Sequence, residues 1–422
     1  MDFRARQPVA RSQLEAGRDA NRTLKRFLAK WIPVRVRKTH QDKIARAAVP
    51  DLTPLGFADL PGFADDDHAA AFALFTRHAA AILDDRRLLR EAMPANAALR
   101  EVCRRALENP ARTGAAARLF FESHFTPHRV QANPENRSAR GFVTGYYEPV
   151  IAGTLTPSSP EAAPILGRPD DLISLSPGES LPGLDPAFSA ARRLADGRCE
   201  PYPDRAAIEA GAIAGRTKPL VYLTDKVEVF FVQVQGSARV TLPDGRSLRL
   251  TYAGRNGQPY TSIGRALVEA GEIPAGDIGM DRVKAWIRAH GQGPGEAGSN
   301  LMLRNKSYVF FARNDHIDPK MGPVGGAGLG LEPMRSIAID RRIWSYGLPF
   351  WLAADLPWQD ATPSAFRRLM IAGDTGSAIL GAARADLFFG SGTQAGQLAG
   401  GIRHACDFTV LLPNAAGQDK NR

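Results

Sequence analysis

Apolar residues recur at intervals of three and four between residues 66 and 123, the spacing that places them on one face of an α-helix. The first run holds Ala71, Leu74, Phe75, His78 and Ile82. Two later runs hold Leu99, Val102, Cys103 and Leu107, and then Ala116, Leu119 and Phe120. We therefore expect three helices that pack as a cap or buttress on a catalytic domain.

From Gly141 onward the pattern changes to short apolar runs between turn residues. Residues 142–147 predict a strand, and the Pro- and Gly-rich stretch 154–203 predicts loops and short strands. Runs of β-branched and aromatic residues predict further strands at 219–223, 227–235 and 247–252. The Asp244–Gly245 pair before the last of these is a typical hairpin turn.

Two helices are expected next, at 262–270 and 280–290, followed by a Gly-rich linker at 291–298. Short apolar runs then predict strands at 308–311, 336–339, 350–353, 368–372, 386–389 and 408–412. The last part of the chain therefore indicates a small β domain with irregular connections, a barrel.

The composition is typical of a globular protein with two or three domains, since 44% of the 422 residues are hydrophobic and 23% are charged. The net charge of +10 fits a polyanionic partner such as nucleic acid, an anionic membrane or an acidic wall polymer; it fits an Arg-rich surface without such a role equally well. No stretch is apolar enough to span a membrane, and the three separated cysteines exclude a zinc knuckle and a disulfide framework.

Residues 1–50 form a basic segment with few apolar positions. We expect a basic amphipathic helix that touches membrane or wall, or a disordered leader. No signal peptide is recognisable in this segment, and it has no cysteine that could carry a lipid.

Three aspartates stand at the ends of predicted strands: Asp340, Asp374 and Asp386. Aspartates at such positions often only cap a turn, because the carboxylate accepts hydrogen bonds from nearby backbone N–H groups. For Asp340 the capping and catalytic interpretations weigh equally. Asp374 and Asp386 lie among glycines and apolar residues, surroundings that suit a carboxyl group in acid–base chemistry, and for these two we favour function.

Asp374-Thr375-Gly376-Ser377 also matches the active-site tetrapeptide of aspartic proteases, in which two aspartates share a proton. The chain has no second copy of the tetrapeptide, so a protease remains a minor alternative. The histidines form no HExxH pattern, and the Gly run at 325–330 does not satisfy the dinucleotide fingerprint. We expect neither a metal nor a cofactor.

Four tyrosines lie beside glycines: Tyr146, Tyr147, Tyr252 and Tyr260. Aromatic faces next to exposed backbone suit the binding of sugar rings. Packing at strand edges explains each tyrosine alone equally well. Their occurrence together with the segment QVQGSARV at 233–240 favours a carbohydrate site.

Taken together, these segments resemble the membrane-bound lytic murein transglycosylase A (MltA) family. The resemblance rests on GYYEP (145–149), QVQGSARVTLPDG (233–245), YAGRNGQPYTSIGRAL (252–267), NKSYVFF (305–311), SIAIDRRIWSYGLPFWLA (336–353) and DTGSAILGAARADLFFG (374–390). The segments occur in this order over roughly residues 140–412, and the last belongs to the so-called 3D domain.

The resemblance implies a mainly β fold with helical additions. A double-psi β-barrel would be formed by residues 51–151 plus 301–415, a second β-barrel would be inserted at 152–300, and a groove would lie between them. The implied reaction cleaves the β-1,4 bond between N-acetylmuramic acid and N-acetylglucosamine in peptidoglycan without water and leaves a 1,6-anhydromuramoyl end. Because the attacking group is the sugar's own C6 hydroxyl, one carboxyl group can act first as acid and then as base.

By position, the family's acid–base residue falls on Asp386, with Asp374 in a supporting role and Asp340 as the third of the set. Substrate binding is expected from Tyr146, Tyr147, Gln235, Gly236, Ser237, Tyr252, Tyr260, Gly376 and Ser377. The expected partner is the peptidoglycan glycan strand in the periplasm or at the outer membrane, with wall-synthesis or division proteins as further candidates. We expect a monomer with no nucleic-acid partner and at most peripheral membrane contact. A glycan-binding envelope protein without catalysis is the main alternative.

Overall fold

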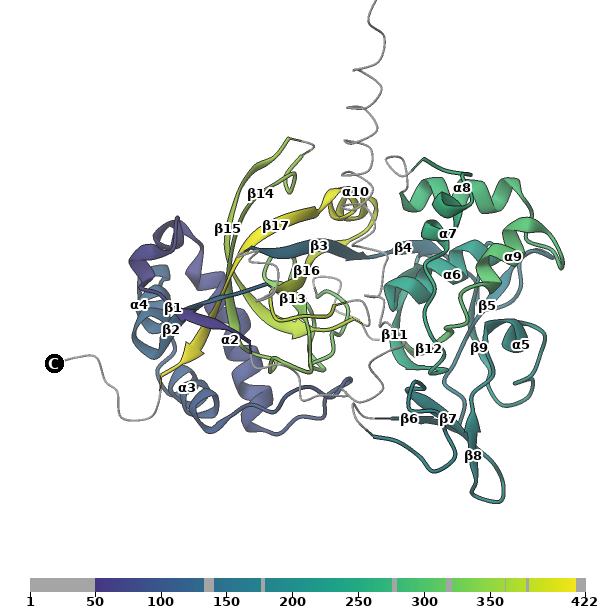
Figure 1. The fold of residues 1–422 in the computed structure, drawn as a ribbon, viewed down its shortest axis with the longest axis horizontal. Coiled ribbons are helices and arrows are strands. Elements are labelled where there is room, and N and C mark those ends of the chain that lie inside the picture. The colour runs from purple at the N-terminus through teal and green to yellow at the C-terminus, as the bar shows by residue number, and fades with distance from the viewer. Residues whose placement is uncertain are drawn as a thin grey trace, which may run out of the picture.

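The computed structural model describes residues 50–132, 140–175, 179–274, 279–315, 321–360, 362–376 and 379–414. Two β-rich modules lie side by side, and the N-terminal helices cover the side of the first module that faces away from the second (Figure 1). The basic segment predicted at the N-terminus falls outside the described residues, apart from Pro50. Within the described residues, no helix has the length and apolar character needed to cross a bilayer.

The first module is a closed barrel of six strands. These are β3 (Gly141–Glu148), β13 (Ser336–Ile339), β14 (Pro349–Leu356), β15 (Ser364–Asp374), β16 (Arg384–Ser391) and β17 (Arg403–Pro413). They pair in the order β17-β14-β15-β13-β16-β3, and the β3–β17 pairing closes the ring. Two of the pairs, β13–β15 and β16–β3, are parallel. The strands predicted at 142–147, 336–339, 350–353, 368–372, 386–389 and 408–412 lie in this barrel, which confirms the expected β domain, whereas the strand predicted at 308–311 belongs to the second module.

Three helices lie on this barrel, as their periodicity predicted: α2 (His68–Leu83), α3 (Ala97–Glu108) and α4 (Gly114–His124). Each begins with a side chain that accepts a hydrogen bond from the first turn, supplied by Asp67, Asn96 and Thr113. Leu107 and Leu119, which the periodicity placed in the apolar stripes, are instead 41% and 62% exposed, so the buried faces are narrower than predicted.

Short elements complete the first module. The strands β1 (Leu52–Pro54) and β2 (Phe125–Val130) extend its sheet beyond β17, and two single turns of 3-10 helix, η1 (Phe57–Asp59) and η2 (Phe63–Asp65), precede α2. The ring of Phe63 packs edge-on against Trp351 of β14, with centroids 5.2 Å apart. This contact joins the N-terminal segment to the barrel core.

The second module is also a ring of strands. Its members are β4 (Val150–Ala152), β5 (Ala163–Leu166), β9 (Pro219–Leu223), β10 (Ser237–Thr241), β11 (Ser247–Arg255) and β12 (Val309–Asn314). The sheet β12-β11-β10-β4 meets the β5–β9 pair through two single bridges, Gly167–Phe311 and Thr154–Tyr222. Because β4 and β12 both belong to this ring, we propose bounds of about 149–315 for the inserted module, wider than the expected 152–300.

Other elements surround the second ring. A small sheet contains β6 (Leu172–Ser174), β7 (Ala190–Arg193) and β8 (Cys199–Pro201), and the helices are α5 (Arg205–Glu209), α7 (Ile263–Glu269), α8 (Met280–Ala289) and α9 (Ala297–Leu303). The short strands in 154–203 and the helices α7 and α8 were predicted. The expected Gly-rich linker at 291–298 is shorter than predicted, since α9 begins at Ala297.

The strand predicted at 227–235 is wrong, because these residues form the helix α6 (Lys226–Gln235). Asp225 caps this helix by accepting a hydrogen bond from the Glu228 N–H at 2.9 Å. The helix is buried on two sides: Val229 and Val232 pack into the second ring, while residues on the other side pack against α7, α8 and α9. A helix buried all round has no polar face, so its apolar run resembles that of a central strand.

One further helix, α10 (Thr393–Gly401), was not predicted. It packs on β3 so closely that a Cβ on Gly145 would lie 2.8 Å from the backbone of Ala399. Gly145 therefore permits the close contact between the two backbones, while Gly396 of α10 leaves room for the ring of Tyr147.

A buried ion pair connects the two barrels. Glu148 at the end of β3 is fully buried, and its carboxylate accepts hydrogen bonds from Arg249 Nε at 2.6 Å and Nη2 at 3.2 Å. Ser391 of β16 donates to the same carboxylate at 2.6 Å. Glu148 belongs to the first barrel and Arg249 to the second, so this pair fixes the position of one module relative to the other.

Candidate active site

Four neighbouring strands of the first barrel bring two of the predicted aspartates into one row. Ala338 of β13 pairs with Asp374 of β15 on one side and with Asp386 of β16 on the other. Asp386 in turn pairs with Thr144 of β3. Adjacent strands lie about 4.8 Å apart, so the backbones of the two aspartates are separated by about 10 Å.

The carboxyl group of Asp386 is half-buried and only partly engaged. Its Oδ1 accepts a hydrogen bond from Thr144 Oγ1 at 2.5 Å, and Arg384 Nη2 donates to the same hydroxyl at 2.7 Å. Within the described part of the chain, Oδ2 of Asp386 accepts no hydrogen bond. The carboxyl group is therefore held at one oxygen, and the other oxygen is left for a ligand.

The carboxyl group of Asp374 is engaged at both oxygens. Oδ1 accepts hydrogen bonds from the backbone N–H groups of Gly326 and Thr375, each at 2.8 Å. Oδ2 accepts one from the Tyr146 hydroxyl at 3.1 Å. Burial raises the pKa of Asp374, although the positive charge of Arg90 and these hydrogen bonds oppose the increase. Asp374 is thus fixed in place and is easier to protonate than an ordinary aspartate.

Tyr146 binds one of the aspartates and lies within electrostatic range of the other. It lies two residues after Thr144 on β3, so both side chains project from the same face of the strand. Its ring packs against Phe388 with centroids 5.3 Å apart, and its hydroxyl reaches Asp374. Burial, together with the negative charges of Asp374 and Asp386, raises the pKa of Tyr146 well above 10.0. The hydroxyl therefore remains a hydrogen-bond donor at physiological pH.

Asp340 is placed differently from the other two aspartates. It is 1% exposed, and its carboxylate binds Arg342 through both oxygens, at 3.0 Å and 2.8 Å. The Gly381 N–H donates to Oδ2 at 2.8 Å. Burial alone would raise the pKa of Asp340, but the bonds from Arg342 and Gly381 outweigh it and lower the pKa. Asp340 thus holds the connection between Asp374 and Asp386 and has no free oxygen.

The Gly run at 325–330 forms a loop against Asp374. The Gly326 N–H binds Asp374, and the Gly326 carbonyl accepts hydrogen bonds from the Leu89 and Arg90 N–H groups at 3.0 and 3.1 Å. A Cβ on Gly326 would lie 2.3 Å from the Tyr346 hydroxyl oxygen. Any larger residue at 326 would clash with this hydroxyl. The loop therefore needs glycine at 326 to pack against Tyr346 and Asp374.

Arg90 extends from the segment after α2 towards both modules. Its Nη1 donates to the Thr375 carbonyl at 2.8 Å, beside Asp374. Its guanidinium carbon lies 4.1 Å from the ring centroid of Tyr252 on β11. The closest atom to a Cβ built on Gly236 is Arg90 Nη2, at 3.8 Å. Arg90, which was not predicted, therefore links the predicted residues Tyr252 and Gly236 to the backbone beside Asp374.

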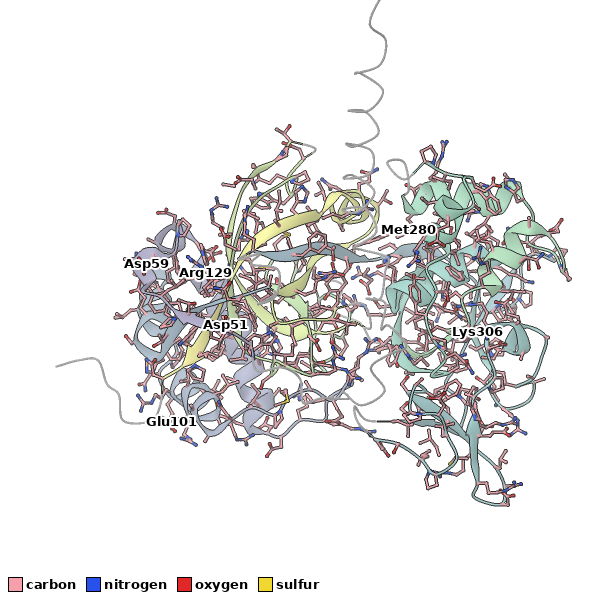
Figure 2. All side chains as sticks on the ribbon, in the orientation of Figure 1. Asp51, Asp59, Glu101, Arg129, Met280 and Lys306 are labelled. Carbon is pink, nitrogen blue, oxygen red and sulfur yellow. The ribbon has the colours of Figure 1, made fainter. Side chains whose placement is uncertain are left out.

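The other residues predicted to bind substrate do not form one cluster with the aspartates. Tyr147 points away from Tyr146; its ring covers Gly396 of α10 and its hydroxyl contacts the sulfur of Met280 at 3.8 Å (Met280 is labelled in Figure 2). Tyr260 belongs to the surroundings of Arg205 inside the second module, where burial raises its pKa. Gln235 ends α6, Ser237 begins β10, and Gly376 follows Thr375, whereas Ser377 lies outside the described residues.

Sequence reasoning missed Thr144, Arg384, Arg90, Gly326 and Tyr346. Thr144 lies two residues before Tyr146, and Arg384 lies two residues before Asp386, but the local sequence marks neither. Only the pairing of β16 with β3, which places Thr144 opposite Asp386, reveals their role. Arg90 carries no local signal, because its contacts are distant in the chain; Thr375, whose carbonyl it binds, is 285 residues away. Among the described residues, no group of three His, Cys, Asp or Glu side chains could hold a metal ion.

Comparison with known proteins identifies related chains. The sequence profile of the MltA-specific insert domain matches residues 142–312, and that of the 3D domain matches residues 335–412. The membrane-bound lytic murein transglycosylase A of Vibrio cholerae is 31% identical over 286 residues, which are 67% of this chain and 68% of that protein.

Solved structures show the same architecture. A membrane-bound lytic murein transglycosylase from Agrobacterium tumefaciens is 34% identical and superposes with a TM-score of 0.75, covering 86% of this chain and 98% of that one. The Escherichia coli MltA with bound chitohexaose is 23% identical and shares the fold with a TM-score of 0.61, over 86% and 95% of the two chains. The combination of two barrels is thus a known fold.

Proposed function

Because the chain belongs to the MltA family of lytic murein transglycosylases, we propose that it cleaves the MurNAc–GlcNAc β-1,4 bond of peptidoglycan without water, using Asp386 alone as acid and then base. The product would carry a 1,6-anhydromuramoyl end. The observation that carries this assignment is the free Oδ2 of Asp386 in the described structure. Asp374 and Asp340 accept hydrogen bonds at both of their oxygens, so Asp386 is the aspartate of the three with an unengaged oxygen in the described structure.

The reaction consumes no net proton, because Asp386 gives up one proton and later receives another. The protonated Asp386 gives its proton to the glycosidic oxygen while the bond from that oxygen to C1 of the muramic acid breaks. The C6 hydroxyl of the same sugar then forms a bond to C1, and its proton passes to the Asp386 carboxylate. No second carboxylate is needed to activate water, in contrast to ordinary glycosidases.

The neighbours of Asp386 would orient it for both steps. Thr144 fixes Oδ1, and Arg384 fixes Thr144 through a hydrogen bond to its hydroxyl. Asp374, on the other side of β13, accepts a hydrogen bond from Tyr146 of β3, and we assign this pair to positioning the sugar. We assign Asp340 the role of holding the 374–386 connection, because it binds Gly381 in that segment.

The arrangement argues against an aspartic protease. That mechanism needs two carboxyl groups that share a proton at hydrogen-bond distance. In the described residues, Asp374 is bound by two backbone N–H groups and a phenol, and β13 separates it from Asp386.

The alternative of a glycan-binding protein without catalysis is distinguished by the experiment below. The substrate exists only in the cell envelope, so we propose envelope localisation and the glycan strand as partner.

The test is digestion of purified sacculi followed by mass analysis of the soluble products. Wild-type protein should release muropeptides that are lighter by one water than hydrolysis products. Asp386→Asn should abolish release, and Asp244→Asn, at an exposed turn in the second module, should leave it unchanged. Activity retained by Asp386→Asn, or products with the hydrolytic mass, would contradict the proposal, and intact sacculi with wild-type protein would support the binding protein instead.

A further inference from the structure

Three arginines beside the candidate active site have no carboxylate partner among the described residues. They are Arg90, Arg255 at the end of β11, and Arg341 directly after Asp340. Their polar contacts are with neutral oxygens: Arg90 binds the Thr375 carbonyl at 2.8 Å, Arg255 the Ser189 hydroxyl at 3.1 Å, and Arg341 the Glu91 carbonyl at 2.6 Å. Within the described part of the chain, none of the three forms a salt bridge with an acidic side chain.

The three guanidinium groups repel one another. Burial lowers the pKa of Arg255 and of Arg341, and the charge of Arg90 lowers both further. Each side chain is half-buried, so water does not fully screen the repulsion. Like charges held together at a cost to stability are typical of functional sites, because a ligand of opposite charge relieves the repulsion.

A second observation at the same place also indicates a ligand. The Tyr346 hydroxyl belongs to a side chain that is 5% exposed, and it has no hydrogen-bond partner among the described residues. Asp374, Arg90 and Arg341 all act electrostatically on this phenol, and Gly326 lies directly against it. A buried hydroxyl without a partner is costly, and a ligand oxygen can supply the missing bond.

We propose that Arg90, Arg255 and Arg341, together with the Tyr346 hydroxyl, bind a carboxylate carried by the glycan strand next to the bond that is cleaved. This inference rests on the proposed function. Arginine matches a carboxylate through paired N–H donors, and the Arg90 guanidinium packs over the ring of Tyr252. The carboxylate is either the lactyl group of a muramic acid without its peptide or a carboxyl group of the attached peptide. A chain of N-acetylglucosamine alone has neither group.

The test is equilibrium binding to the Asp386→Asn protein, in which turnover does not interfere. Three ligands are compared: chitohexaose, glycan strands stripped of peptide, and glycan strands that carry peptide. Arg341→Gln in this background should weaken carboxylate-bearing ligands about tenfold, the loss of one charge-assisted hydrogen bond, and leave chitohexaose unchanged. Arg198→Gln, which removes one positive charge from the exposed β7–β8 turn, serves as the matched control and should change nothing.

A loss confined to stripped strands assigns the lactyl carboxylate, a loss confined to peptide-bearing strands assigns the peptide, and a loss on both shows that either group is accepted. The inference is overturned if Arg341→Gln and a second variant, Arg90→Gln, weaken all three ligands equally or weaken none, with melting temperatures confirming that both are folded. These outcomes do not depend on catalysis. A wild-type protein that released no anhydro products would refute the proposed function while the binding difference still stood.

Discussion

Asp374 and Asp386 lie on the two strands that flank β13, each paired with the same residue of that strand. That residue is Ala338, which is 4% exposed. Paired residues on neighbouring strands project from the same face, so a small side chain separates the two carboxyl groups. The site therefore depends on alanine at this position as well as on the acids.

Replacement of Ala338 by leucine should inactivate the protein without unfolding it. The added atoms would enter the space between the two carboxyl groups and displace them, at a cost of about 1–3 kcal/mol for overpacking. Anhydro-muropeptide release and the free energy of unfolding would both be measured. Ala338→Gly is the control that leaves the space open. If Ala338→Leu kept full activity, the space between the Asp374 and Asp386 carboxyl groups would not form part of the site.

The hydroxyl of Thr144 should contribute to catalysis by fixing Asp386. Thr144→Val keeps the shape of the side chain but removes the donor to Oδ1 and the acceptor for Arg384. We expect kcat to fall about tenfold with KM little changed, because the lost bond positions the acid and does not touch the sugar. Thr144→Ser should retain most activity. A selective increase in KM would instead place Thr144 in substrate binding.

The contribution of Asp374 to the free energy of unfolding should decrease as pH rises. Its pKa in the folded protein is raised above the usual 3.8 by burial, so the folded state holds the proton to a higher pH than the unfolded state. Stability from this group is fully present below pH 3.8 and is lost as pH rises through the folded pKa. Asp374→Asn should therefore become more stable relative to wild type with rising pH, as measured by denaturant unfolding. An unchanged or reversed difference would contradict this assignment.

Asp340 should have the opposite dependence on pH. Its folded pKa is lowered from 3.8, since the bonds from Arg342 and Gly381 outweigh burial. Its contribution is therefore present above pH 3.8 and is lost as pH falls through the folded pKa. Asp340→Asn should lose about 1–3 kcal/mol at pH 7, the cost of disturbing a buried hydrogen-bonded charge, and less at pH 3. A large drop in kcat without any loss of stability would instead indicate direct contact with substrate.

The sequence allowed most strands to be predicted, together with the positions of Asp374 and Asp386 near strand ends, because those features depend on neighbours along the chain. The apolar runs of β15 and β16 and the glycines after Asp374 are local signals. The helix α6 was misread because its burial on two sides removes the polar face that would reveal its period. Arg90 was missed because its environment is created by contacts with Thr375 and Tyr252, which no local pattern encodes.

The buried pair of Glu148 and Arg249 should be the most sensitive link between the two barrels. Glu148→Ala leaves Arg249, whose side chain is 4% exposed, without a compensating charge, which costs about 3–5 kcal/mol. The exposed pair of Asp244 and Arg246 is the control, and Asp244→Ala should change the free energy of unfolding by no more than about 0.5 kcal/mol.

A double variant separates the charge effect from the loss of packing. Glu148→Leu with Arg249→Met removes both charges but keeps apolar volume, and it should recover most of the stability lost in Glu148→Ala. Activity should recover less than stability, because the ion pair fixes the second barrel, with Tyr252, relative to Asp374 and Asp386. Thermal unfolding and muropeptide release of the same preparations would show this difference. Equal recovery of both would mean that packing alone sets the distance between the barrels.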